Sequence, residues 1–138
     1  VYNGELTNGL GNFSARVLTL AEKQEGLKAV ALPREIDERI SAARKKVEES
    51  IKAFRLHEAL GAVFDLVHFG DEYVNRTKPW ETKDKVVVLS LIILLDNIAG
   101  LISPFLPETA EKITKSIIWA EDGTLTIKKG EVLFPRIS

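Results

Sequence analysis

The sequence predicts an all-α fold, a helical bundle of about five helices that is followed by a short extended or hairpin tail. Apolar residues recur every three or four positions along most of the 138 residues, which is the period of an amphipathic helix. Prolines at 33, 79, 104 and 107 divide this pattern into segments of ordinary helix length. The chain has no cysteine, so a disulfide framework is excluded and packing must hold the fold.

The apolar pattern and its breaks define the expected helices. They run from about Glu5 to Lys23, from Pro33 to about Phe54, from about Leu56 to near Pro79, from Thr82–Asp84 to Pro104, and from Pro107 to about Ile117. Val86–Leu95 is apolar almost all round, which predicts a helix that is buried on most sides. Its uninterrupted apolar part is shorter than the about 20 residues of a membrane span, so a core helix is expected.

The character of the sequence changes near its end. Thr124–Ile127, Lys128–Glu131 and Val132–Phe134 combine β-branched residues with a glycine-containing turn, which predicts a small hairpin or an extended tail. We therefore expect a single domain, with the helical bundle over residues 1–118 and the tail over residues 119–138.

Charge and motif content exclude several classes of function. Nineteen Lys and Arg balance 20 Asp and Glu to a net charge of −1, which excludes a domain that binds nucleic acid by bulk charge but allows a local basic patch. His57 and His68 cannot form a His-rich metal site, and no metal site is expected. The sequence contains no phosphate-binding glycine loop, nucleophile elbow or His-Glu-x-x-His string, so we expect no catalytic residues.

Asn12 and Arg16 form a candidate binding pair on the first helix. They are four residues apart, so their side chains lie one turn apart on the same face. Their mean direction is about 100° from the centre of the apolar stripe, which predicts that both are exposed. An amide and a guanidinium together offer donors and an acceptor that suit the edge of a nucleobase. Ordinary surface polarity remains the alternative explanation of the pair.

Trp80 follows a proline directly at the break between the third and fourth helices. A tryptophan in such a place is either a plug for the core or a platform on which an unpaired base stacks. The sequence alone leaves both open. Its basic neighbours could contact phosphates in the second case; they are Arg76, Lys78, Lys83 and Lys85.

Four strings of residues occur together in an order and at separations that are typical of one family. They are Asn8–Arg16 (NGLGNFSAR), Gly70–Trp80 (GDEYVNRTKPW), Pro104–Ala110 (PFLPETA) and Leu133–Ile137 (LFPRI). Through them the whole chain closely resembles the anticodon-binding domain of methionyl-tRNA synthetase, a class I aminoacyl-tRNA synthetase. Gly4 and Gly9 depart from the family, whose members often carry larger residues there.

The resemblance implies a tRNA-binding domain that recognises the CAU anticodon of methionine tRNA. It implies that Trp80 stacks on an anticodon base and that Asn12 and Arg16 hydrogen-bond to anticodon bases. Asn75, one turn before Trp80, would help to exclude wrong anticodons, and Arg76 and Lys78 would be supporting residues.

The resemblance also implies that the chain is a non-catalytic piece of a cytoplasmic methionine–tRNA ligase, which fits the absence of methionine even at position 1. ATP, Mg²⁺ and zinc would belong to the catalytic domain, and none of them to this chain. The expected partners are tRNA and that catalytic domain, with no membrane and no DNA. Two alternatives remain: a helical interaction or scaffold module without an RNA ligand, and the anticodon domain of another class I synthetase.

Overall fold

Six helices and two short strands form the part of the chain that the computed structural model describes, which is residues 2–22, 33–119 and 125–127. The helices are α1 (Tyr2–Glu22), α2 (Arg34–Lys52), α3 (Leu56–Thr77), α4 (Pro79–Thr82), α5 (Lys85–Ile102) and α6 (Pro107–Ser116). The strands are β1 (Ile117–Trp119) and β2 (Leu125–Ile127). The predicted all-α helical bundle is confirmed.

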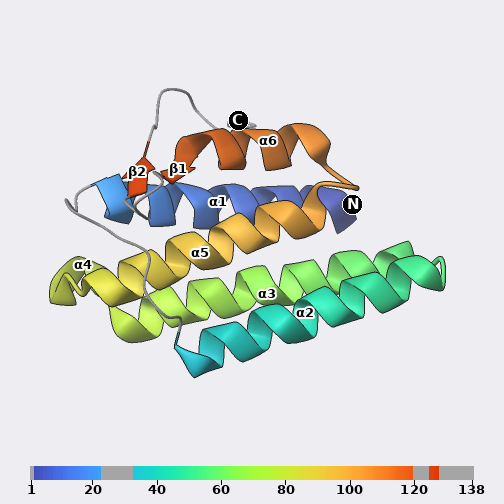
Figure 1. Cartoon of the computed structure of the whole chain (residues 1–138), viewed down its shortest axis with the longest axis horizontal. Helices are drawn as coiled ribbons and strands as arrows, with labels where there is room; N and C mark the ends of the chain where they lie inside the picture. The colour runs from blue at the N-terminus through green and yellow to red at the C-terminus, as the bar shows by residue number, and fades with distance from the viewer. Residues whose placement is uncertain (1, 23–32, 120–124, 128–138) are drawn as a thin grey trace.

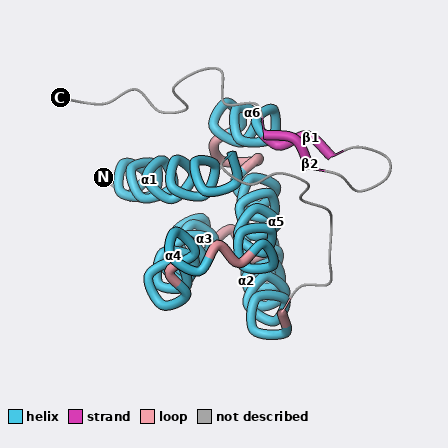
Figure 2. The backbone as a smooth tube through the Cα atoms, turned by 90° about the vertical axis from the view of Figure 1, so that its left-hand side faces the viewer, coloured by secondary structure: helices cyan, strands magenta, loops and turns pink. Residues whose placement is uncertain are grey.

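The long helices are stacked from α6 at one edge to α2 at the other (Figure 1). α2 and α3 run antiparallel side by side, and α5 lies between this pair and α1. Figure 2 shows that α1 is inclined to the other long helices and that α6 lies on the side of α1 away from α2. α1 and α3 run in the same direction, so their C-terminal ends lie at the end of the bundle that α4 occupies.

The helix boundaries follow from local sequence chemistry. α5 begins after Asp84, whose carboxylate accepts hydrogen bonds from the backbone N–H groups of Val86 (2.9 Å) and Val87 (3.3 Å), the usual function of an aspartate N-cap. α3 ends at Thr77 because the next residue precedes a proline and adopts the left-handed conformation. Pro107 occupies the first position of α6, where its missing N–H carries no cost.

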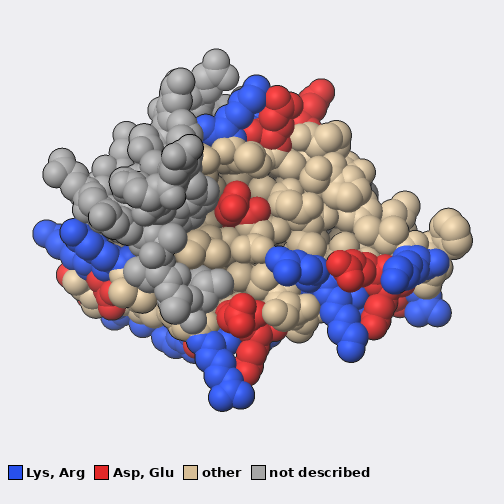
Figure 3. All heavy atoms as spheres, viewed as in Figure 1, with Lys and Arg blue, Asp and Glu red and all other residues tan. Residues whose placement is uncertain are grey.

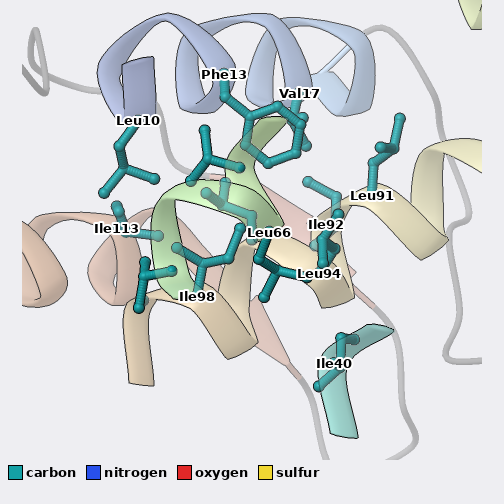
Figure 4. Packing of buried hydrophobic residues seen from close by; sticks show 14 of the residues in the cluster. Leu10, Phe13, Val17, Ile40, Leu66, Leu91, Ile92, Leu94, Ile98 and Ile113 are labelled. Carbon is teal, nitrogen blue, oxygen red and sulfur yellow. The ribbon is translucent and has the colours of Figure 1, made fainter. Parts of the chain in front are cut away.

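The core lies between α1, α3, α5 and α6, and the buried apolar face of α2 extends it. Side chains of α1 point from one side onto those of α5, with α3 and α6 closing the cluster (Figure 4). The labelled members are Leu10, Phe13 and Val17 of α1, Ile40 of α2, Leu66 of α3, Leu91, Ile92, Leu94 and Ile98 of α5, and Ile113 of α6. Among the described residues, only α5 is long and apolar enough for a membrane span, and 61% of it is buried in the bundle. This burial confirms the expected core helix.

Two details of the elements were not predicted. The break between the third and fourth helices contains a separate helical turn, α4, because Pro79 starts a new turn after the left-handed residue. The last helix ends at Ser116, and the three residues after it form β1, which pairs antiparallel with β2 so that Ile117 faces Ile127. The sequence had placed Ile117 in the helix. The other residues of the predicted tail, 120–124 and 128–138, lie outside the described residues.

Candidate nucleic-acid interface

Arg16 connects α1 to α3 through both of its terminal nitrogens. Its Nη1 donates to Oδ1 of Asp71 at 3.3 Å, and its Nη2 donates to Oδ1 of Asn75 at 2.9 Å. Asp71 and Asn75 are four residues apart on α3, so the two oxygens lie one turn apart on the same face. The guanidinium is therefore held in one orientation by two acceptors, with its side chain 39% exposed.

Asn12 lies one turn before Arg16 on α1 and is exposed. The next residue, Phe13, is fully buried, which confirms that the polar pair flanks the apolar stripe. The amide and the guanidinium thus lie one turn apart, as the spacing predicted, but Arg16 is only partly exposed and less so than Asn12, because it is bound to α3. The structure brings Asn12, Arg16 and Asn75 to neighbouring parts of α1 and α3.

Partial burial shifts the pKa of the Asp71 carboxyl group. Loss of hydration raises the pKa of its carboxyl group, while the positive charges of Arg16 and, more weakly, His68 oppose this rise. A half-buried carboxylate that faces a guanidinium keeps that guanidinium in place better than a fully solvated one, because water competes less for both groups. Sequence reasoning missed Asp71, although its position four residues before Asn75 marks the same helix face.

Trp80 stands in the single turn of α4, which lies between two residues of left-handed backbone. Lys78 has φ 47° and Lys83 has φ 53°, a conformation that costs a non-glycine residue roughly 1–2 kcal/mol. The turn is held by the buried Pro79 and by hydrogen bonds from Thr82 N to Lys78 O (3.0 Å) and Lys83 N to Pro79 O (2.9 Å). The Trp80 side chain is 48% exposed, so it is not a plug of the core.

Basic side chains, with acidic ones beside them, lie at the end of the molecule that α4 forms (Figure 3). Lys78, Lys83 and Lys85 are exposed there. Arg76, by contrast, contacts other protein side chains. Its Nη2 donates to Glu35 of α2 at 2.8 Å, and its guanidinium lies 5.2 Å from the centre of the Tyr73 ring. The hydrogen bond to Glu35 raises the pKa of Arg76. Its contacts join α3 to α2, a use that the sequence did not predict.

No other feature of the described residues forms a competing site. A groove between α2 and α3 has a volume of about 380 Å³ and a floor of small residues, including Ala43 and Gly61. Acidic and basic side chains both line it, and none of its side chains carries a buried polar atom without a hydrogen-bond partner. Residues 2–22, 33–119 and 125–127 contain no group of three or more His, Cys, Asp or Glu side chains that could hold a metal ion.

The chain matches a known family along most of its length. A sequence profile described as "Anticodon-binding domain of tRNA ligase" matches residues 33–134. The chain therefore belongs to the family of anticodon-binding domains of tRNA ligases.

Its relatives within that family include methionine–tRNA ligases. The chain is 32% identical to the methionine–tRNA ligase of Clostridium acetobutylicum over 161 aligned residues, which cover 98% of this chain and 25% of the relative. It is 31% identical to that of Bacillus cereus over 151 residues, which cover 99% of this chain and 28% of the relative. The resemblance to methionyl-tRNA synthetase is thus confirmed, and the chain spans about a quarter of the length of these relatives.

A solved structure shares the fold. The apo form of Mycobacterium tuberculosis methionyl-tRNA synthetase superimposes with a TM-score of 0.76 at 22% identity, over 99% of this chain and 33% of that one. The bundle described above is therefore the fold of the corresponding part of that enzyme.

Proposed function

We propose that this domain binds the anticodon loop of methionine tRNA and recognises its CAU sequence. The observation that carries the proposal is Trp80, a half-exposed indole on a turn whose backbone is fixed at both ends. A rigid aromatic surface open to solvent is what a splayed-out base requires. Stacking of a base on an aromatic side chain contributes about 1–3 kcal/mol, so Trp80 alone can supply a measurable part of the affinity.

Recognition of sequence requires hydrogen bonds to base edges, which stacking does not provide. Asn12 offers both an amide donor and a carbonyl acceptor, and Arg16 offers donors in a fixed fork. Both lie on α1, whose C-terminal end is at the same end of the bundle as α4. We assign the stacking of the first anticodon base to Trp80 and the reading of base edges to Asn12 and Arg16, with Asn75 in support.

The phosphate backbone would be contacted by the lysines around α4. Lys78 is exposed close to Trp80, and Lys83 and Lys85 are exposed just after it in the chain. A domain of net charge −1 gains little from long-range attraction, so such local contacts would position the RNA rather than select it. Arg76 contributes indirectly, by fixing α3 against α2.

The whole protein would be a cytoplasmic methionine–tRNA ligase. Its relatives carry that name and are about four times as long as this chain. We place the ATP-dependent activation of methionine, with Mg²⁺ and zinc, in the part of the protein outside this chain. The anticodon domain would then hold the tRNA while the catalytic domain acts on its other end, which increases the effective concentration of that end.

A binding titration with two RNA stem-loops tests the proposal. One stem-loop carries CAU and the other differs only in the first anticodon base, and each is titrated into the 138-residue chain at low and moderate salt. Binding is followed by Trp80 fluorescence in a Trp119→Phe background, because the chain has two tryptophans. Saturable binding that prefers CAU, with quenching of Trp80, is the expected result.

The other outcomes separate the alternative functions. Equal binding of both stem-loops that disappears with salt would mean attraction to phosphates alone. Preference for a different anticodon would assign the domain to another class I synthetase. A folded chain that binds neither RNA would contradict the proposal and favour a scaffold function.

A further inference from the structure

We propose that Asp71 is a positioning residue for anticodon recognition, which acts by fixing the direction in which Arg16 presents its donors to the RNA. The inference rests on the proposed function, because it takes Arg16 as a residue that binds a base edge. Nothing in the sequence pattern assigned a function to Asp71. Its position in the structure suggests one, because Asp71 is one of the two residues that hold the guanidinium of Arg16.

The two acceptors bind different nitrogens of the Arg16 guanidinium, and both are needed to fix its orientation. Asp71 takes a hydrogen bond from Nη1 and Asn75 takes one from Nη2, so the plane of the fork is fixed by two points one helical turn apart. A single acceptor would leave the guanidinium free to rotate about that bond. With both in place, the remaining N–H donors of Arg16 point in a direction set by α3 rather than by solvent.

Holding Arg16 in advance reduces the entropic cost of binding. An arginine side chain has many rotamers, and the entropic cost of immobilising such a side chain at an interface can weaken binding by up to about tenfold. Part of that cost is already met in the free protein, because Arg16 is paired before RNA arrives. Loss of the Asp71 contact would restore this cost to the binding step.

The charge of Asp71 adds a second effect, on selectivity. Its carboxylate lies 3.3 Å from Nη1 of Arg16 and offsets the positive charge of the guanidinium. A compensated guanidinium attracts phosphates weakly, yet still forms directed hydrogen bonds with a base edge. Without Asp71, Arg16 would become a mobile cation that binds any RNA backbone, and that contact carries no sequence information.

A double-mutant cycle between Asp71 and Arg16 tests the inference. The chains compared are unsubstituted, Asp71→Ala, Arg16→Ala and the double variant, each titrated with the CAU stem-loop and its first-base variant at several salt concentrations. Asp71→Ala is expected to weaken CAU binding up to about tenfold, the equivalent of the immobilisation cost above. It should weaken binding of the variant stem-loop less, and increase the salt dependence of binding.

Two further variants separate positioning from general stability. Asp71→Asn keeps an oxygen that can accept the hydrogen bond from Arg16 but removes the charge, so it should retain most of the CAU affinity while increasing the salt dependence of binding as Asp71→Ala does. Asp96→Ala removes another half-buried carboxylate, on α5, that has no ion-pair partner among the described residues, and it should leave RNA selectivity unchanged. Thermal unfolding by circular dichroism checks each fold, and Asp71→Ser replaces Asp71→Ala if the latter unfolds at the assay temperature.

The outcomes distinguish the inference from the function on which it rests. If Arg16→Ala leaves CAU preference intact, Arg16 does not bind a base edge and both proposals for it are wrong. If Arg16→Ala reduces the preference while Asp71→Ala does not, only the inference is overturned. It is also overturned if Asp71→Ala has the same effect in the Arg16→Ala background, because the effect must then bypass Arg16.

Discussion

The ring of Phe13 on α1 occupies the space in which a side chain at Gly70 of α3 would lie. A Cβ atom at residue 70 would be 2.5 Å from Cζ and 2.6 Å from Cε1 of Phe13, and 3.1 Å from Cδ2 of Leu94. Phe13 is adjacent in sequence to Asn12, and Gly70 is adjacent to Asp71. The close approach of the two helices at this point therefore sets the distance across which Arg16 meets α3.

Gly70→Ala should disturb both stability and binding. The added methyl group has to displace a fully buried ring, and overpacking of this kind costs typically about 1–3 kcal/mol. We expect a lower free energy of unfolding in urea and a weaker preference for CAU, because α1 shifts relative to Asp71 and Asn75. A variant that is as stable as the original would show that the helices can separate without strain.

Gly9→Ala is the matched substitution in open space, and it should have the opposite effect. Gly9 lies inside α1, and a Cβ there would meet nothing within 4 Å. Alanine restricts the unfolded chain and favours the helix by roughly 0.5–1 kcal/mol relative to glycine. Urea unfolding monitored by circular dichroism should show this gain. A loss of stability would indicate that glycine at this position serves a contact outside the described residues.

Trp80→Ala should weaken RNA binding without unfolding the bundle. Loss of the stacking surface is expected to reduce CAU affinity by about 1–3 kcal/mol, while Trp80→Phe should retain part of it. The control is Phe54→Ala, which removes a 92% exposed aromatic side chain at the opposite end of the bundle, between α2 and α3. Equal loss of affinity in the control would mean that exposed aromatic residues bind the RNA without a specific site.

Ser14→Ala should stabilise the fold. The Ser14 hydroxyl is completely buried and has no hydrogen-bond partner among the described residues, and an unsatisfied buried group of this kind costs roughly 1–3 kcal/mol. Ser90 is the matched control, since its buried hydroxyl donates to the carbonyl of Val86 at 2.6 Å. Calorimetry should show a higher Tm for Ser14→Ala than for Ser90→Ala. The reverse order would contradict this prediction.

Asp96 should give the fold a pH dependence of known sign. Burial raises the pKa of its carboxyl group above the ordinary value of 3.8, so the folded state binds its proton more readily than the unfolded state does. The associated stability is complete at acid pH and is lost as the pH rises through the raised pKa. Asp96→Asn should therefore raise Tm at pH 7, and the gain should shrink as the pH is lowered toward 4. A gain that is constant with pH would show that the charge of Asp96 is not its source.

The sequence predicted the helices well because each depends on local information. The apolar period of α5, the aspartate before it and the prolines around α4 and α6 act within a few residues of the boundaries they set. The β1–β2 pairing was not predictable in the same way. Ile117 fits the apolar face of α6 as well as it fits a strand, and only the position of Leu125–Ile127 decides between them.

In the candidate site, too, the features that depend on local spacing were predictable and those that depend on helix packing were not. Asn12 and Arg16 could be paired from their spacing, since helix geometry fixes their relation. The contact of Arg16 with Asp71 spans 55 positions, and that of Arg76 with Glu35 spans 41. Such contacts depend on how the helices pack, which charge pattern alone does not determine. The exposure of Trp80 likewise follows from the burial of Pro79 and not from the tryptophan itself.

The central position of α5 leaves part of its apolar surface uncovered for a time during synthesis. This helix packs against α1 and α3, which precede it in the chain, and against α6, which follows it. During synthesis, α5 therefore leaves the ribosome with partners for two of its sides already present and with its α6 side still bare. Until α6 emerges and covers it, the exposed apolar side of α5 can be bound by chaperones or can start aggregation. The short Pro104–Pro107 connection keeps that interval brief.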